Sequence, residues 1–220
     1  MTRLGLLGLG ARSTEYYFNK LNKLYNLKNG GYSTFPMLLL NTNFNELNNL
    51  LPKPNDDLLI ALRRFLQEFE KFEIDKVILP NITLHESLDI LIDNQETHLK
   101  FIHPIELCIS QLMQNGITQI MLFATRYTSN SVYFEEKFVK HGIELMRPTE
   151  SEILFLDKFR KKVFASMELK EDIMTYNSLI GKYHLEFPIV VACSELSIVT
   201  KSNLTNVFDL AEIQIQDALL

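Results

Sequence analysis

The chain has 220 residues, 46% of them hydrophobic and 22% charged, which is the balance of an ordinary globular protein. Its formal net charge of -5 argues against nucleic acid and anionic membrane surfaces as partners, because both attract basic patches. Two cysteines, Cys108 and Cys193, are too few for a disulfide framework and indicate a reducing compartment. The apolar N-terminal run is too short for a signal peptide, and no stretch reaches the length of a membrane span. We therefore expect a cytoplasmic protein.

The first predicted element is a short apolar strand at residues 4–9, which ends in a turn at Gly8 and Gly10. A helix is predicted to begin near Ser13, with Thr14 in its first turn. A strand, a glycine turn and a helix N-terminus together form a corner that binds anions through backbone N–H groups. The dinucleotide-binding fingerprint needs a third glycine where Ser13 stands, together with a later acidic residue, and both are missing. We therefore interpret this corner as a site for a small carboxylate.

A second buried strand is predicted at residues 36–40 and ends at Asn41. The Asn-rich segment that follows predicts a loop or a lid. Apolar residues between positions 58 and 72 then recur at three- and four-residue spacing, which predicts an amphipathic helix capped by Asp56 or Asp57.

Polar residues also follow the third predicted strand, at residues 76–79. They include Asn81, Thr83 and His85. Residues 100–102 form a candidate fourth strand.

The second half of the chain begins with a predicted helix at residues 104–114, which starts at a proline and stops at Asn-Gly. Cys108 is in step with the apolar residues of this helix, so we interpret it as a core residue. Residues 119–124 predict a strand, and Thr125 and Thr128 follow directly at its end.

Helical sequence is then predicted up to Gly142, and a short strand at residues 143–146. Thr149 and Glu152 have the spacing of a capping box at the start of the next helix. Further helix is predicted over most of residues 154–181.

The most informative stretch is an unbroken apolar run at residues 189–192, which is typical of a strand buried on both faces of a parallel sheet. Cys193, Ser194 and Glu195 stand at its carboxyl end, where open α/β sheets bind ligands. A thiol there can ionise and act as a base or a nucleophile. The alternative is an inert core cysteine, because free cysteines are among the most buried residues.

Strands alternate with helices of roughly 10 to 20 residues, which indicates βαβ units and parallel sheets. Both halves share this rhythm, so we predict an α/β fold with two pseudo-symmetric lobes, each a parallel sheet flanked by helices, and an active-site cleft between them. We assign residues 1–102 and 206–220 to the N-terminal lobe and residues 103–205 to the second lobe. A final helix, capped by Asp209, is expected to pack on the N-terminal lobe, because each sheet needs cover on both faces.

Five segments resemble the aspartate/glutamate racemase superfamily, in the order and spacing of that family and over nearly the whole chain. Residues 8–14 (GLGARST) are similar to its G-G-M-S/G-x-x-S/T-T turn, and residues 17–22 to the tyrosine pair and asparagine that follow. Residues 80–85 (PNITLH) resemble P-C-N-T-x-H, and residues 124–128 (ATRYT) resemble A-T-x-x-T. Residues 192–196 (ACSEL) resemble G-C-T-E-L/V.

The resemblance implies a cofactor-independent amino-acid racemase that forms a homodimer and uses neither pyridoxal phosphate nor a metal. Its substrate would be an amino acid or a related small carboxylate. One cysteine from each lobe would flank this substrate, one removing the Cα proton as a thiolate and the other returning a proton to the opposite face. Backbone amides and Thr or Asn side chains would hold the carboxylate and stabilise the developing charge.

Carried onto this sequence, the resemblance makes Cys193, Asn81 and Thr83 the catalytic candidates. The substrate-binding candidates are Gly8, Gly10, Thr14, Asn41, Thr125, Thr128, Ser194 and Glu195. We expect Cys193 to lie at a strand end with its sulfur reachable by solvent, because a sealed sulfur would exclude catalysis.

The sequence departs from the family at the first cysteine, where Asn81 stands, and at the next position, where Ile82 replaces an asparagine. A neutral amide cannot remove a carbon-bound proton. The loop arginine of aspartate-specific relatives is also missing between residues 41 and 52, which leaves Arg12 and Arg126 as possible substitutes.

Three functional interpretations follow. The first is a racemase in which Thr83, His85 or a held water replaces the first cysteine. The second is a one-cysteine enzyme like the family's arylmalonate decarboxylase branch, where loss of CO2 forms the carbanion and only one proton donor is needed. The third is a degenerate protein of the same fold that binds a small carboxylate or a protein partner without catalysis.

Overall fold

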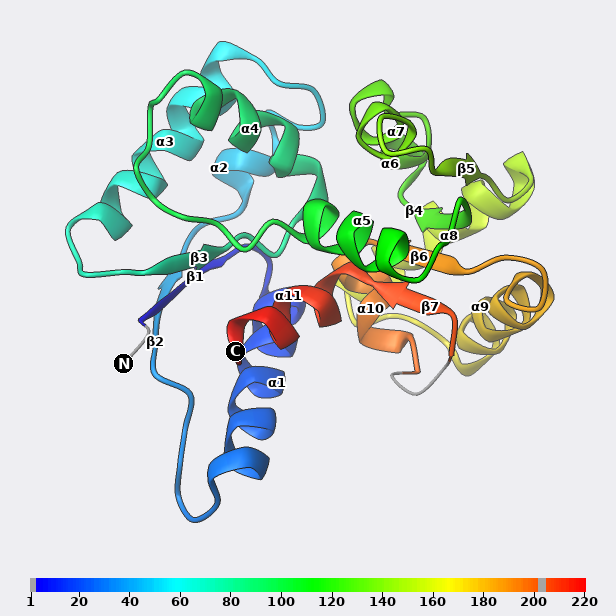
Figure 1. The fold of residues 1–220 in the computed structure, drawn as a ribbon, viewed down its shortest axis with the longest axis horizontal. Helices are drawn as coiled ribbons and strands as arrows, with labels where there is room; N and C mark the ends of the chain where they lie inside the picture. Colours follow the sequence, from blue (N-terminus) through cyan, green and yellow to red (C-terminus); the bar gives the residue numbers. More distant parts are fainter. Residues whose placement is uncertain (1–2, 202–204) are drawn as a thin grey trace. The chain divides into compact units, whose positions relative to one another are not determined.

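The computed structural model describes residues 3–201 and 205–220 (Figure 1). The chain divides into two compact units, one made of Met1–His103 with Gln214–Leu220 and the other of Pro104–Ile213. Each unit contains one parallel sheet flanked by helices, which confirms the predicted α/β fold class. No helix in the described part of the chain is both long enough and apolar enough to span a bilayer.

The sheet of the first unit has three strands in the order β2-β1-β3. They are β1 (Leu4–Gly8), β2 (Met37–Asn41) and β3 (Lys76–Ile78), all parallel, and all three were predicted within two residues at each end. The predicted fourth strand is wrong as an element, because it forms only an isolated bridge between Val77 and Phe101.

Alternate residues of β1 point to opposite faces of this sheet, as the period of two requires. Leu7 belongs to a buried apolar cluster that also contains Leu62 and Phe69 of α3 and Leu88 of α4. In Figure 1, α2, α3 and α4 lie on one side of the strands and α1 on the other. The helices of this unit are α1 (Ala11–Asn29), α2 (Asn45–Asn48), α3 (Asp56–Glu70), α4 (His85–Asp93) and the 3-10 helix η1 (Ile82–Leu84).

Two local predictions for the first unit are wrong. The segment predicted as a loop or lid contains the short helix α2, whose Leu47 is fully buried in the core cluster. The cap of α3 is Asn55 rather than Asp56 or Asp57, because the Asn55 side chain accepts the backbone N–H of Leu58 at 2.9 Å. Both aspartates instead lie in the first helical turn, where their charges favour the positive end of the helix dipole.

The sheet of the second unit has four parallel strands in the order β5-β4-β6-β7. They are β4 (Gln119–Ala124), β5 (Glu144–Met146), β6 (Ile189–Ala192) and β7 (Val207–Asp209). The first three were predicted, and β7 was missed because only two consecutive apolar residues, Val207 and Phe208, mark it in the sequence. Since β7 pairs with β6, the second unit extends past the expected boundary at residue 205.

Helices cover one face of the second sheet, where a buried apolar cluster lies. Phe123 of β4 and Val191 of β6 pack there with Leu156 and Phe159 of α8 and Tyr176 of α9. The helices of this unit are α5 (Pro104–Gln114), α6 (Arg126–Ser129), α7 (Val132–Val139), α8 (Glu150–Phe164), α9 (Lys170–Tyr183) and α10 (Ser194–Val199). The predicted capping box of α8 is confirmed, and the predicted core position of Cys108 is confirmed by its complete burial.

The last helix, α11 (Leu210–Ala218), is capped by Asp209 as predicted, because Asp209 Oδ1 accepts the backbone N–H groups of Ala211 and Glu212. From Gln214 onward the helix belongs to the first unit. There the Tyr17 hydroxyl donates to Gln214 Oε1 at 2.6 Å, and Gln214 Nε2 donates to the carbonyl of Ile102 at 2.7 Å.

Candidate functional site

The predicted binding residues of the first unit lie at the carboxyl ends of its parallel strands. Gly8 ends β1 and is paired with Asn41, which ends β2. The two backbones approach so closely that a Cβ on Gly8 would lie 2.9 Å from the Asn41 Cα. Thr42 closes the same corner, because its backbone N–H and its hydroxyl both donate to the Gly8 carbonyl, at 3.2 and 2.8 Å. This close approach explains why the corner needs a glycine.

Gly10 and Thr14 continue the corner into the first turn of α1. Gly10 precedes the helix with φ of 82°, a left-handed conformation that glycine adopts without strain. The backbone N–H and the hydroxyl of Thr14 both donate to the Gly10 carbonyl, at 3.0 and 2.7 Å. Thr14 is 7% exposed, so its hydroxyl is a nearly enclosed group that fixes the turn.

Asn81 follows β3 and caps the short helix η1. Its Oδ1 accepts the backbone N–H of Leu84 at 3.1 Å, and Thr83 lies half-buried inside η1. The order β2-β1-β3 brings Asn81 and Thr83 to the same edge of the sheet as Gly8 and Asn41.

His85 is fully buried beneath Asn81 rather than displayed beside it. Its Nδ1 lies 2.9 Å from the Asn81 carbonyl, and its ring packs edge-on against His103 with centroids 4.8 Å apart. Burial and the nearby His103 lower the pKa of His85 to about 3, so the ring is neutral at physiological pH. These contacts remove the support for His85 as the acid or base that replaces the first cysteine.

Cys193 occupies the predicted position at the end of β6, where it precedes α10 as the N-cap residue. It belongs to the apolar cluster under α8 and α9 and is only 5% exposed. The expectation of an open, solvent-reachable sulfur is therefore wrong in degree, because the helices that cover the sheet extend over the strand end. Cys193 is therefore a buried residue of the second unit.

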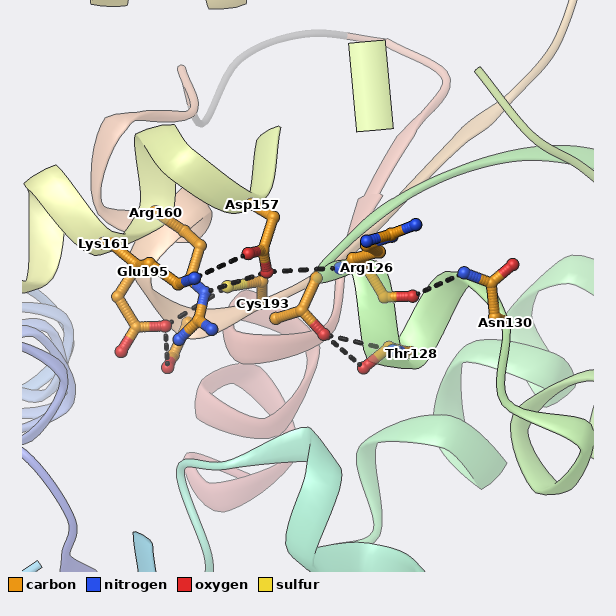
Figure 2. Close-up of polar contacts among 10 residues, drawn as sticks. Arg126, Thr128, Asn130, Asp157, Arg160, Lys161, Cys193 and Glu195 are labelled. Atoms are coloured by element: carbon orange, nitrogen blue, oxygen red, sulfur yellow. Dashed lines mark hydrogen bonds and ion pairs between the residues drawn. The ribbon is translucent and has the colours of Figure 1, made fainter. Parts of the chain in front are cut away.

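The Cys193 thiol donates a hydrogen bond to Glu195 Oε2 at 3.2 Å (Figure 2). The Ser194 hydroxyl approaches the same carboxylate oxygen at 3.4 Å. Burial raises the pKa of Cys193 well above its usual value, and the Glu195 carboxylate raises it further. The backbone of Leu196 and the guanidinium of Arg160 act in the opposite direction. At neutral pH the resting group is therefore a protonated thiol bound to a carboxylate.

Thr125 and Thr128 lie at the end of β4, which is the neighbour of β6. Thr125 Oγ1 caps α6 by accepting the Thr128 backbone N–H at 3.1 Å, and the two hydroxyls are 3.0 Å apart. Because Ala124 pairs with Ala192, the two threonines and Cys193 stand at one edge of the second sheet.

Of the two arginine candidates, Arg126 is occupied elsewhere. Its guanidinium forms an exposed ion pair with Glu150 at 3.1 Å, and Figure 2 shows its side chain directed away from Cys193. Arg12 is half-buried in the first turn of α1.

Sequence reasoning missed two charged residues near Cys193, Asp157 and Arg160 of α8. Figure 2 shows the Arg160 side chain extending toward Cys193 and Glu195. The signal in the sequence is weak, since a D-x-x-R pair on a helix normally describes a solvated face. Among the described residues, no cluster of His, Cys, Asp and Glu has the geometry of a metal site.

Comparison with known proteins places this geometry in a known fold. No family model matches the chain, and no curated protein matches it in sequence. A putative Asp/Glu racemase from Yersinia pestis is similar, with 22% identity, a TM-score of 0.83 and coverage of 100% of this chain and 98% of that one. An aspartate racemase homologue from Pyrococcus horikoshii shares 21% identity over 99% and 97% of the two chains, with a TM-score of 0.82. The aspartate racemase of Picrophilus torridus shares 19% identity over 99% and 94%, with a TM-score of 0.75.

Because the sequence identities are low, these similarities establish the fold alone. The chain has the two-sheet α/β fold of solved aspartate racemase structures along essentially its whole length. The fold expected from the five sequence segments is therefore confirmed.

Proposed function

We propose that this chain is a divergent member of the aspartate/glutamate racemase superfamily and a cofactor-independent amino-acid racemase that uses Cys193 for Cα proton transfer. The observation that carries the proposal is the Cys193–Glu195 hydrogen bond of 3.2 Å at the end of β6, in a chain with this fold. A thiol held against a carboxylate at a strand end is equipped to move a proton.

The chemistry needs Cys193 in two protonation states. Transfer of the Sγ proton to Glu195 Oε2 leaves a thiolate, which can take the Cα proton of the substrate. The protonated thiol in turn returns a proton to the carbanion. The Thr125 and Thr128 hydroxyls, with backbone amides at the strand ends, are the proposed groups that bind the substrate carboxylate and stabilise the carbanion.

The proton on the other face of the substrate would come from the first unit. By the motif resemblance, Asn81 stands at that position, and its amide serves as a cap rather than as an acid or base. Thr83 or a water held by Asn81 is the proposed second proton carrier. We expect the active protein to be a cytoplasmic homodimer that needs no cofactor or metal.

A second candidate is a reaction that needs only one proton delivery, such as decarboxylation of a malonate-type acid. The observation that favours it is the resting state of Cys193, a protonated thiol, combined with an amide at position 81. In this reaction the loss of CO2 forms the carbanion, and Cys193 donates its proton once.

The decisive experiment incubates the protein with separate L- and D-amino acids in D2O and follows the Cα–H signal by NMR. A racemase exchanges this hydrogen and forms the opposite enantiomer. Cys193→Ser should abolish both the hydrogen exchange and the formation of the opposite enantiomer. Cys108→Ala, a change at the other buried cysteine, should leave both intact.

Two results would contradict the racemase proposal. Exchange that survives Cys193→Ser would exclude Cys193 as the proton carrier. No Cα–H exchange in any amino acid, together with decarboxylation of arylmalonates, would favour the one-cysteine reaction. No reaction in either assay would favour a carboxylate-binding protein without catalysis.

A further inference from the structure

Arg160 is the cation of α8 whose charge acts on the Cys193 thiol, although no racemase-like segment of the sequence includes it. It projects from α8, which packs against α10, and Figure 2 shows its side chain beside those of Cys193 and Glu195. Its guanidinium lowers the pKa of the Cys193 thiol, against the raising effects of burial and of Glu195.

The guanidinium is held in place by Asp157, one turn earlier on the same helix. Arg160 Nε donates to Asp157 Oδ1 at 3.4 Å, and the two side chains are 31% and 16% exposed. Within residues 3–201 and 205–220, this is the one hydrogen bond of the guanidinium, so the terminal nitrogens Nη1 and Nη2 remain available to another group.

Asp157 is itself fixed by contacts from two elements. Its Oδ1 accepts the backbone N–H of Arg126 at 3.3 Å, and its Oδ2 lies 3.0 Å from Lys161 Nζ. Burial raises the pKa of Asp157, but these contacts and Arg160 outweigh that effect and lower it. Asp157 is therefore a stable anion that orients Arg160.

The other ionisable groups around the thiol do not supply a positive charge. On α10, the Glu195 carboxylate accepts the hydrogen bond of the thiol. On α9, burial raises the pKa of Tyr176, so its hydroxyl stays neutral and donates to or accepts from Thr200 Oγ1 at 2.7 Å. At the end of β7, Asp209 is buried and bound to Ser197 at 2.6 Å. Lys161 of α8 is directed to Asp157.

We propose that Arg160 is a positioning residue for proton transfer, which stabilises the Cys193 thiolate when the thiol proton moves to Glu195. The inference rests on the proposed function of Cys193 as the proton carrier. In this step the Sγ–H bond breaks and an O–H bond forms at Glu195 Oε2. The new negative charge on sulfur replaces the one lost from the carboxylate.

The test measures the thiolate directly, without relying on turnover. Iodoacetamide alkylates thiolates, and the rate at Cys193 is followed by mass spectrometry at several pH values between about 7 and 9.5. We expect Arg160→Gln to slow alkylation about tenfold at a given pH, the effect of one pKa unit. Arg160→Lys, which keeps the charge, should restore most of the rate.

Lys161→Gln is the matched control, because it removes a neighbouring positive charge from the same helix that also contacts Asp157. We expect it to change the rate less than about twofold, since its side chain is 62% exposed and its charge is screened by solvent. Circular dichroism and melting temperature establish that each variant is folded.

A purely structural role for Arg160 gives the opposite sign. If Arg160 only packs over the thiol, Arg160→Gln opens the site and alkylation becomes faster. An alkylation rate in Arg160→Gln that is faster or unchanged would overturn the inference. So would an equal decrease of the rate in Lys161→Gln, or no alkylation of Cys193 in the native protein at the highest pH. If Arg160→Gln slows alkylation of Cys193 tenfold but the native protein racemises no amino acid, the electrostatic role of Arg160 is upheld and the racemase proposal is rejected.

Discussion

The protonation of Asp209 should control the stability of the second unit at neutral pH. The side chain is 6% exposed at the junction of β7 and α11. Its Oδ1 accepts hydrogen bonds from Ser197 Oγ at 2.6 Å and from the backbone N–H of Ala211 at 2.9 Å. Burial raises the pKa of Asp209 from 3.8 to about 7, although the bond from Ser197 opposes the change.

The sign of the pH dependence follows from this raised pKa. The contribution of Asp209 to stability is complete below the unfolded-state pKa of 3.8 and is lost as the pH rises through about 7. Between about pH 4.5 and 7 the folded chain keeps a proton that the unfolded chain releases. The free energy of unfolding therefore falls by about 1.4 kcal/mol per pH unit, or about 3 kcal/mol over this range. Asp209→Asn keeps an acceptor oxygen for the cap but does not ionise, so it should not show this loss.

The assay is urea unfolding of the native chain and of Asp209→Asn at several pH values, followed by circular dichroism. Between about pH 4.5 and 8, the free energy of unfolding of the variant should rise by about 3 kcal/mol relative to that of the native chain. Asp93→Asn, at an exposed position in α4, is the control and should give a nearly constant difference. A change below about 1 kcal/mol for Asp209→Asn would refute the argument that a buried, protonated carboxyl caps α11.

Two further predictions concern residues of the first unit and use the same unfolding assay, with Gly181 in α9 of the second unit as the comparison position. Gly8→Ala should destabilise by about 1 to 3 kcal/mol, because the new Cβ would lie 2.5 Å from Asn41 Oδ1 and 2.9 Å from its Cα. Gly181→Ala meets no atom within 4 Å and should stabilise by about 0.5 to 1 kcal/mol, so equal effects of the two would contradict the close-approach argument. Asn55→Ala should cost about 1 kcal/mol through loss of the α3 cap, and a larger loss from Asp56→Ala would show that the cap is assigned to the wrong residue.

The strand ends were predictable from the sequence because two simple signals coincide there. An unbroken apolar run such as residues 189–192 is typical of a strand covered on both faces, and a polar group after it falls at the carboxyl edge. Thr125 and Cys193 were identified in this way. The pairing of β4 with β6, which places them at neighbouring strand ends, comes from the structure, since strand order depends on packing between distant segments.

The charges that act on the site were not predictable for the same physical reason. Asp157 and Arg160 lie on a helix with an ordinary apolar stripe of Leu156, Phe159 and Val163, and their sequence is that of a solvated face. Only the packing of α8 against α10 brings Arg160 to Cys193. The burial of Cys193 was underestimated because the sequence places it after the strand but does not show which helices extend over the strand end.

Asn81 caps η1 and, by the motif resemblance, stands where racemases have their first cysteine. Its replacement by cysteine should therefore change the stability of the fold and the proton-transfer activity in different directions. Its side chain caps η1 at 3.1 Å, and asparagine is a strong cap where cysteine is not. Asn81→Cys should therefore lower the free energy of unfolding by about 1 kcal/mol, the usual effect of losing a cap. The same variant should raise racemisation of a small amino acid, because a thiol can exchange a carbon-bound proton and an amide cannot. Asn81→Ala is the matched control, since it loses the cap without gaining a thiol. A folded Asn81→Cys protein that racemises nothing in the NMR panel would contradict this prediction.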